Sequence, residues 1–259
     1  MLNNLLWVVL SPILSCCLLF IIPNSVYGQD SAQWVINNYL EKTGGIQIWE
    51  KTKAVQRRGI SSRFNGGYTG TSAEGETTFY LDVINRDGDT NKSHKNMGNG
   101  RSDSTFFCYE SGRVSMLIVY KDGTSRFEQI PGEGHYYYKA FDPQLVFFDV
   151  EPTLWTYAGR TSETDHDYYV LNYKTPGENG SQYFFDTETG FLMKSEVQEP
   201  HSVVEYEEYT AVEGRLIPLV MKHYRLGRLV SQRRHTQVEY GARVLPCHEF
   251  MPDHEADGQ

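Results

Sequence analysis

At 259 residues, the chain is long enough to bury a substantial core, and one large β-rich domain is its simplest organisation. Aromatic residues make up 14% of the chain, with 18 Tyr and 13 Phe, an excess that favours strands over helices. The formal net charge of −9 excludes the basic surface that a nucleic-acid-binding protein needs, so no nucleic-acid partner is expected.

Residues 1–28 form an uncharged apolar leader. They contain no Asp, Glu, Lys or Arg, and polar sequence begins at Gln29, a pattern that is typical of an export signal. Cleavage before Gln29 is one expectation, and retention as a membrane anchor through residues 5–22 is another. A third is lipidation at Cys16, because the residues before it resemble a lipobox. The expected location is the periplasm or cell envelope, with the fate of the leader left open.

Residues 31–42 predict an amphipathic helix. Asp30 or Ser31 would supply the N-cap, and Gly44-Gly45 would end the helix. A shorter helical turn is expected in "IQIWEKTKA" (46–54). The apolar positions of the first helix fall on one helical stripe, at Ala32, Val35, Ile36, Tyr39 and Leu40.

From Ala54 onward the sequence predicts an antiparallel meander of strands. Short β-rich runs such as "TTFYLDVI" (77–84), "VSMLIVY" (114–120) and "DYYVLNY" (167–173) alternate with turn sequences. Two further hairpins centre on Glu213-Gly214 and on Gly227. Pro218 has no N–H to donate, so its strand is expected to be an edge strand or to be bulged there.

Two connecting segments differ from this pattern. Residues 84–104 are polar and rich in glycine, which predicts a long exposed loop. Residues 141–159 contain two prolines and a dense apolar cluster, which indicates a helical turn or a lid segment.

The strand predicted at 167–173 is apolar on both faces. Tyr169, Leu171 and Tyr173 alternate with Tyr168 and Val170, whereas a sheet with one wet face would alternate apolar with polar residues. Two covered faces fit a curved sheet with lipid or a helix on its concave side. They also fit a two-layer sandwich with a filled core, and the pattern alone leaves both open.

The stretch "YFFDTETGFLMKSE" (183–196) contains two carboxylates near its centre. Asp186 and Glu188 could hold a cation or act as a catalytic dyad. The same residues fit the corner of a hairpin, in which Asp186 caps the loop through its side chain and Gly190 adopts a positive φ. We favour the hairpin, with Asp186 and Phe191 as the last cross-strand pair.

The chain lacks the local motifs of common catalytic sites. It has no Gly-x-Ser-x-Gly, no His-Glu-x-x-His and no phosphate-binding glycine loop. We therefore expect no catalytic residue, no metal site and no cofactor. His166, between Asp165 and Asp167, is interpreted as a solvated loop residue. A hydrolase would need His166 to share a pocket with a Ser or Asp from elsewhere in the chain.

Cleavage before Gln29 would leave two cysteines, Cys108 and Cys247. In an oxidising compartment they could form a disulfide, and two buried thiols are the alternative.

Four stretches in succession resemble the outer-membrane lipoprotein-sorting family. They are "YLEKTGGIQIWEKTKAVQRRG" (39–59), "YFFDTETGFLMKSE" (183–196), "YTAVEGRLIPLVMKHY" (209–224) and "TQVEYGARVLPCHEFMP" (236–252). In order and spacing they are similar to LolA- and LolB-like periplasmic half barrels, especially the divergent members from Bacteroidetes-type bacteria. The resemblance implies a mainly β fold with some α: an incomplete antiparallel β-barrel of about eleven strands, with an N-terminal helix and lid helices around an apolar cavity.

The domain boundaries that follow are a signal peptide or membrane anchor at 1–28, a single half-barrel domain at 29–250 and a flexible acidic tail at 251–259. The function implied is a non-enzymatic carrier of lipid acyl chains or lipoproteins. Trp34 and Trp49 are expected near the lid. The residues expected to line the cavity are Trp155, Tyr169, Leu171, Tyr173, Phe184, Phe191 and Met193.

Two other functions remain open. The same fold could serve as an envelope sensor or scaffold that binds a membrane-associated protein partner. A secreted hydrolase with a site assembled from distant residues is the third possibility.

Overall fold

The computed structural model describes residues 31–65, 73–85, 90–96, 104–110, 113–131, 147, 152–163, 165–174, 180–197 and 201–252. The predicted leader and most of the predicted tail lie outside these residues. Within them, no helix has the length and hydropathy to cross a membrane.

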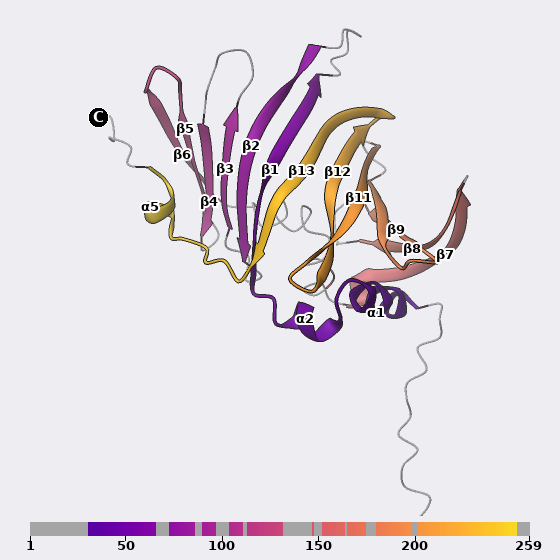
Figure 1. Ribbon diagram of the computed structural model, residues 1–259. Coiled ribbons are helices and arrows are strands. Elements are labelled where there is room, and N and C mark those ends of the chain that lie inside the picture. The colour runs from indigo at the N-terminus through magenta and orange to yellow at the C-terminus, as the bar shows by residue number, and fades with distance from the viewer. Residues whose placement is uncertain are drawn as a thin grey trace, which may run out of the picture.

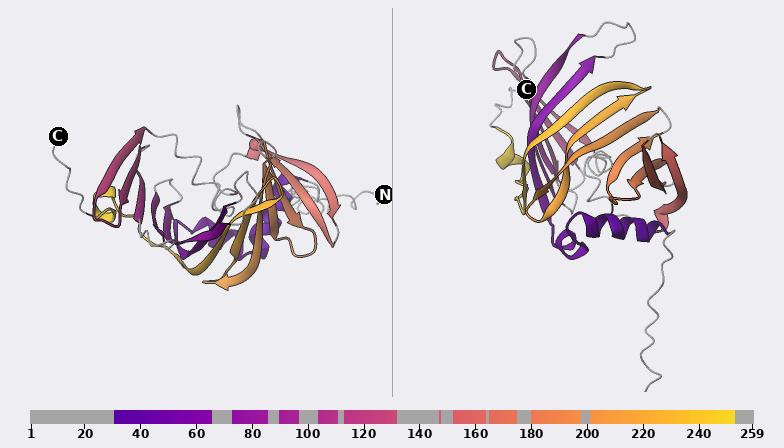
Figure 2. Two further views of the ribbon diagram at one scale, coloured as in Figure 1. Left: turned by 90° about the horizontal axis from the view of Figure 1, so that it is seen from above. Right: turned by 45° about the vertical axis from the view of Figure 1, so that its right-hand side comes forward.

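The described strands form one antiparallel sheet of thirteen strands (Figure 1). Its order is β6-β5-β4-β3-β2-β1-β13-β12-β11-β10-β9-β8-β7, so that two meanders meet where β1 pairs with β13. The edge strands β6 and β7 do not pair with each other, and the sheet curves without closing (Figure 2). This open, curved sheet confirms the predicted half-barrel class, with thirteen strands in place of about eleven.

The strand bounds follow the predicted meander in chain order. They are β1 (Ala54–Asn65), β2 (Ala73–Asn85), β3 (Thr90–Asn96), β4 (Ser104–Glu110), β5 (Arg113–Val119), β6 (Ser125–Pro131), β7 (Trp155–Glu163), β8 (His166–Tyr173), β9 (Ser181–Asp186), β10 (Leu192–Val197), β11 (Ser202–Val212), β12 (Arg215–Arg225) and β13 (Arg228–Tyr240).

The first helix begins and ends as its sequence predicts. In α1 (Ala32–Lys42), the Ser31 Oγ accepts a hydrogen bond of 3.1 Å from the backbone N–H of Trp34. The helix buries its predicted stripe from Val35 to Leu40. A short α2 (Ile46–Glu50) follows, and both helices lie at one end of the sheet, the lower end in Figure 1.

The segment 84–104 is not one long exposed loop as predicted, because β3 crosses it. β3 pairs with β2 from Thr78↔Asn96 to Ile84↔Thr90, and with β4 on its other side. Its sequence, "TNKSHKN", has no apolar alternation. Backbone hydrogen bonds to two neighbours do not require apolar side chains, so this interior strand gave no periodic signal.

Pro218 lies in an interior strand, at a position that is paired with a neighbouring strand on one side only. β12 is flanked by β11 and β13, and Pro218 pairs with Tyr209 of β11. On the other side, the pairing with β13 runs only from Arg225 to Val220. Pro218 lies beyond this ladder, so its missing donor removes no hydrogen bond there.

The two faces of the sheet are packed differently. We call the face that carries the α1 contacts the core face, and the opposite one the outer face. The core face holds the main cluster, in which α1 and Trp49 pack against residues of β1, β2 and β7 to β13. A smaller outer-face cluster contains Tyr168, Val170, Phe184 and Met193. β8 is therefore buried on both sides, as its sequence predicted.

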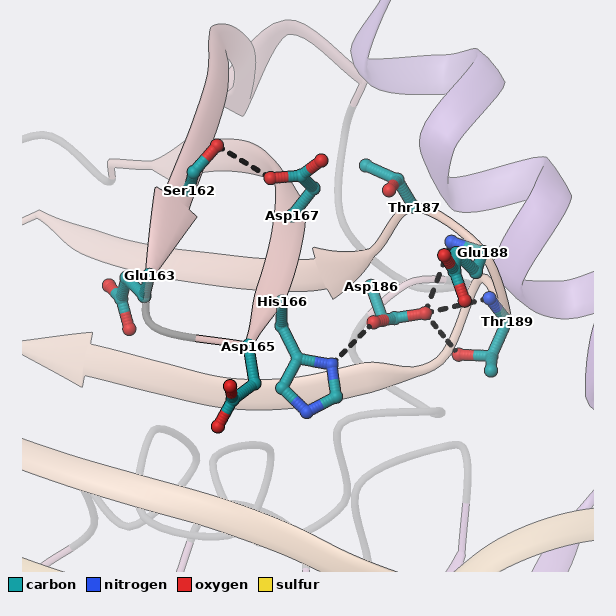
Figure 3. Close-up of a pocket in the computed structure, with 9 residues that line it drawn as sticks. All are labelled: Ser162, Glu163, Asp165, His166, Asp167, Asp186, Thr187, Glu188 and Thr189. Atoms are coloured by element: carbon teal, nitrogen blue, oxygen red, sulfur yellow. Dashed lines mark hydrogen bonds and ion pairs between the residues drawn. The ribbon is translucent and has the colours of Figure 1, made fainter.

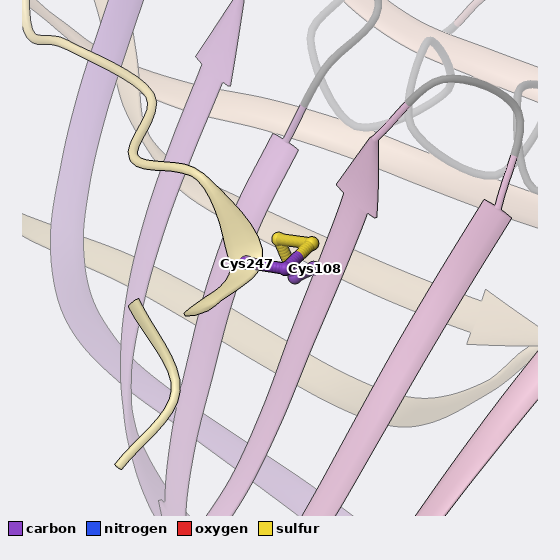
Figure 4. Close-up of a disulfide and its surroundings, with 2 residues drawn as sticks. All are labelled: Cys108 and Cys247. Carbon is purple, nitrogen blue, oxygen red and sulfur yellow. A yellow bond between two sulfur atoms is a disulfide. The ribbon is translucent and has the colours of Figure 1, made fainter. Parts of the chain in front are cut away.

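A disulfide attaches the C-terminal segment to β4. Cys108 and Cys247 are bonded with their Cα atoms 5.5 Å apart, which joins α5 (Cys247–Phe250) to the sheet (Figure 4). Met251 and Leu117 are buried beside the bond, and Phe250 packs edge-on to a strand aromatic. Of the two alternatives for the cysteines, the structure has the disulfide.

Candidate functional site

Four of the predicted lining residues gather on the core face. Trp155, Tyr169 and Leu171 are buried, and Tyr173 is half-buried beside them. The Trp155 and Tyr173 rings are 4.8 Å apart between centroids. Their placement follows from the ladder, in which Trp155↔Tyr173 and Tyr157↔Leu171 are opposed across β7 and β8.

The other three predicted lining residues lie elsewhere. Phe184 and Met193 belong to the outer-face cluster, where the Lys194 Nζ lies 4.2 Å from the centroid of the Phe184 ring. Phe191 stacks on Tyr209 at 4.4 Å, beyond the end of β9. A register shift between Leu192 and Lys194 changes the alternation along β10. The predicted set therefore does not share one face, and contact with a ligand remains a prediction for all of it.

The two tryptophans predicted near a lid lie on the first two helices. The Trp34 ring of α1 meets Tyr169 edge-on at 5.2 Å. Trp49 of α2 is fully buried, and its Nε1–H donates to the Thr43 Oγ1 at 3.1 Å. Both helices are packed against the core face, so each indole is part of the packed structure in this conformation.

Phe147 lies at the centre of an aromatic cluster on the core face. It is helical and 6% exposed, and it comes from the segment predicted to be a helical turn or lid. Its ring centroid is 5.3 Å from that of Trp155, 5.4 Å from Tyr39, 5.5 Å from Phe185 and 5.8 Å from Tyr183. Phe147 therefore fills the space between α1 and the strands β7 and β9.

The indole N–H of Trp155 has no acceptor among the residues that the structure describes. Trp155 is 5% exposed, and its Nε1 has no hydrogen-bond partner among the described residues. A buried donor left unsatisfied destabilises the folded state by about 1–3 kcal/mol. An acceptor oxygen placed at this position on the core face would satisfy the donor.

A polar pocket of about 420 Å³ opens at the α1 end of the sheet (Figure 3). It is formed by the β7–β8 turn and the β9–β10 turn. Side chains with carboxylates and hydroxyls dominate its walls, so it suits a polar ligand rather than an acyl chain. The lining residues are Ser162, Glu163, Asp165, His166, Asp167, Asp186, Thr187, Glu188 and Thr189.

Asp186 caps the β9–β10 turn, as the hairpin interpretation predicted. Its Oδ1 accepts hydrogen bonds from the backbone N–H groups of Glu188 and Thr189 at 3.1 and 2.7 Å, and from the Thr189 hydroxyl at 2.8 Å. Gly190 closes the turn with φ 77°, and the Asp186 N–H donates to the Phe191 carbonyl. Burial alone would raise the pKa of Asp186, but these hydrogen bonds and one with His166 hold it below its ordinary value.

His166 contacts Asp186 without forming a nucleophile–base pair. Its Nδ1 lies 3.0 Å from the Asp186 Oδ2, a contact between residues 20 apart that the sequence did not reveal. The Ser162 hydroxyl donates to the Asp167 Oδ1 at 2.5 Å. Among the nine lining residues, no hydroxyl hydrogen-bonds His166, so the arrangement lacks the contact through which an imidazole would activate a hydroxyl.

A second polar group, also missed from the sequence, is buried on the core face between β2 and β13. The Tyr80 hydroxyl and the His235 Nδ1 are 2.5 Å apart, and both side chains are buried. The Arg233 guanidinium pairs with Asp82 at 3.2 Å and lies over the Tyr80 ring. Burial, together with the nearby Arg57, lowers the pKa of His235 to about 3, so its imidazole is neutral.

The fold has solved counterparts. No protein-family model matches the chain, and no curated protein matches it in sequence. A DUF1329 family protein from Desulfovibrio piger is similar with a TM-score of 0.54 at 8% identity, over 86% of this chain and 100% of that one. The LolA superfamily protein NE2245 from Nitrosomonas europaea gives 0.52 at 12% identity, over 86% and 98%.

An outer membrane lipoprotein-sorting protein domain from Vibrio parahaemolyticus gives a TM-score of 0.51 at 8% identity, over 83% of this chain and 94% of that one. At such identities the similarity shows the fold alone. The chain thus shares the fold of LolA superfamily and lipoprotein-sorting proteins, which confirms at that level the resemblance seen in its sequence motifs.

Proposed function

We propose that this protein is a non-enzymatic carrier that holds a lipid acyl chain, free or attached to a lipoprotein, against the core face of its curved sheet. The observation that carries the proposal is the match to lipoprotein-sorting and LolA superfamily folds over most of both chains. A half barrel shields an apolar ligand from water by surrounding it with aromatic and aliphatic side chains. Such shielding needs no cofactor and no covalent step.

The aromatic cluster around Phe147 is the proposed entrance to the ligand site. Phe147 occupies the core face beside Trp155, where an acyl chain would replace its ring contacts at little change in apolar burial. The ester or amide carbonyl of an acylated ligand would accept a hydrogen bond from the Trp155 Nε1, which has no partner within the described part of the chain. In this proposal, Phe147 moves away when the ligand enters.

The proposal includes an exported location. The uncharged leader would direct the chain to the periplasm or cell envelope, and the single half-barrel domain would begin after it. The Cys108–Cys247 disulfide fits an oxidising compartment. Either a cleaved or a retained leader is compatible with carrying an acyl chain.

Native mass spectrometry after purification without detergent tests the proposal. The expected result is a protein that carries copurified acyl lipids, which organic extraction removes and which rebind on addition. A protein that is free of lipid when purified, and that does not take up a fluorescent acyl probe, would refute the carrier. The scaffold alternative would then be the better account of the fold.

A further inference from the structure

The turn between β12 and β13 has an unusual sequence for its geometry. It consists of Leu226 and Gly227, flanked by the cross-strand pair Arg225↔Arg228. Both central residues have positive φ, 50° at Leu226 and 73° at Gly227. The Leu226 side chain is 66% exposed, the largest value among the exposed large hydrophobic residues described. The tip of this hairpin is thus a leucine between two arginines.

Two features of this tip destabilise the folded protein when nothing is bound to the tip. A two-residue hairpin turn with two positive φ values prefers Asn, Asp or Gly at its first position, and a leucine there is strained. Two arginines directly opposite each other repel. Residues in disfavoured backbone conformations are frequent at functional sites. Here both features lie at an exposed tip and not in the core.

The same end of the sheet carries other exposed apolar and basic side chains. Phe64 at the end of β1 and Tyr120 after β5 are both more than a third exposed. Among the described residues, Arg63 and Lys121 are exposed beside them. The carboxylate of Asp122 is exposed there too and accepts hydrogen bonds from Thr124. These ends of β1, β5 and β12 point away from α1 and α2 (Figure 1).

A pocket at the opposite end of the sheet is lined by acidic residues. The polar pocket beside α1 has carboxylates from the β7–β8 and β9–β10 turns. The chain as a whole carries a net charge of −9, so a basic end is not what its composition predicts. Exposed basic side chains on such a chain favour the approach of the end that carries them to an anionic surface.

We propose that the Arg225–Arg228 tip docks on the surface of a bilayer that contains anionic phospholipid. The two arginines would bind lipid phosphates, which relieves their mutual repulsion, and Leu226 would enter the interface between headgroups and acyl chains. Phe64 and Tyr120 would lie along the same contact. This goes beyond the proposed carrier function, since docking at the tip does not depend on what the core face holds.

Flotation with vesicles tests the docking. The full chain is expected to float with vesicles of phosphatidylcholine and phosphatidylglycerol, to bind phosphatidylcholine alone weakly, and to lose binding at high salt. The double variant Arg225→Ser/Arg228→Ser should bind the anionic vesicles at least about tenfold more weakly, and Leu226→Asn severalfold more weakly. A Lys51→Ser/Lys53→Ser variant removes the same charge near α2 and should bind as the wild type does.

Hydrogen exchange measures protection at the tip itself, and binding of vesicles through the leader would not protect the tip. Anionic vesicles should slow exchange in the peptide that contains residues 225–228. Leu226→Asn should also raise the Tm without vesicles, because asparagine tolerates positive φ. The β11–β12 turn also has two residues with positive φ, Glu213 and Gly214, and Glu213→Asn should leave vesicle binding unchanged. No vesicle binding, equal binding by the arginine variant, or an unprotected tip would overturn the proposal.

Discussion

The ring of Phe147 lies 5.3 Å from the indole ring of Trp155, and this contact joins the segment before β7 to the core face. Phe147→Ala should lower the free energy of unfolding by about 3–5 kcal/mol, since a buried aromatic ring is lost. If Phe147 occupies the ligand entrance, the variant should also take up a fluorescent acyl probe faster than the wild type.

Phe250→Ala is the matched control for this variant. Phe250 packs against Phe106 in the small cluster under α5, away from the proposed entrance. This variant should lose stability without faster probe uptake. Stopped-flow fluorescence measures uptake, and equal rates in the wild type and Phe147→Ala would contradict the role given to Phe147.

Trp155→Phe separates the hydrogen-bond donor of Trp155 from its packing. The substitution removes a buried N–H that has no acceptor among the described residues, and it retains an aromatic ring. The loss of the unsatisfied donor should offset part of the lost packing, so unfolding in denaturant should show a change within about 1.5 kcal/mol. Affinity for an acyl ester should fall about tenfold.

Comparison with a ligand that has no acceptor makes the Trp155 experiment specific. An alkane of the same chain length should bind the wild type and Trp155→Phe with equal affinity, because it has no oxygen to receive the indole hydrogen bond. A variant that loses affinity for the ester and the alkane alike would mean that Trp155 contributes only packing.

His235 should make stability depend on pH in the weakly acidic range. Its pKa is lowered to about 3 in the folded protein, against about 6.5 in an unfolded chain. Between these values the unfolded state binds the extra proton, so stability is full above pH 6.5 and decreases as the pH falls toward 3. The wild type should lose up to about 1.4 kcal/mol per pH unit relative to His235→Gln. Urea unfolding at several pH values measures this, and parallel curves for the two proteins would count against a neutral buried imidazole.

Asp186 should contribute to stability as a turn cap rather than as a ligand. Asp186→Ala removes the three hydrogen bonds that Oδ1 accepts, and it should lower the free energy of unfolding by about 2 kcal/mol. Glu188→Ala changes an exposed carboxylate in the same turn and should alter it by less than about 0.5 kcal/mol. Thermal unfolding compares the two. A strong effect of added divalent cations on wild-type stability would instead favour the metal interpretation of this turn.

The Asp186 contribution also has a pH dependence of known sign. Because the pKa of Asp186 is lowered in the folded protein, its stabilisation is present above the ordinary carboxyl pKa and is lost as the pH falls below about 4. The difference in unfolding free energy between the wild type and Asp186→Ala should therefore shrink in acid.

The sequence predicted elements whose signal is local. The apolar stripe of α1 and its cap at Ser31, and the turn at Asp186, depend on residues a few positions apart, and all of them are confirmed. β3 was missed because its sequence has no apolar alternation, whereas the ladders that pair it with β2 and β4 join residues from different parts of the chain.

The candidate site could be predicted only in part. Alternation along 167–173 separated Tyr169 from Tyr168, but it could not tell which face α1 would cover. Contacts such as Tyr80 with His235 join residues 155 apart, and only the paired strands bring them together. For the Leu226 tip a local signal did exist, since leucine is unusual before Gly227 in a two-residue turn.

The most direct test of the carrier is native mass spectrometry of the protein purified without detergent. The expected mass is higher than that of the polypeptide by one or more acyl lipids, and this lipid-bound population should be smaller in Trp155→Phe. A single lipid-free mass in the wild type, together with no uptake of added acyl ester, would contradict it.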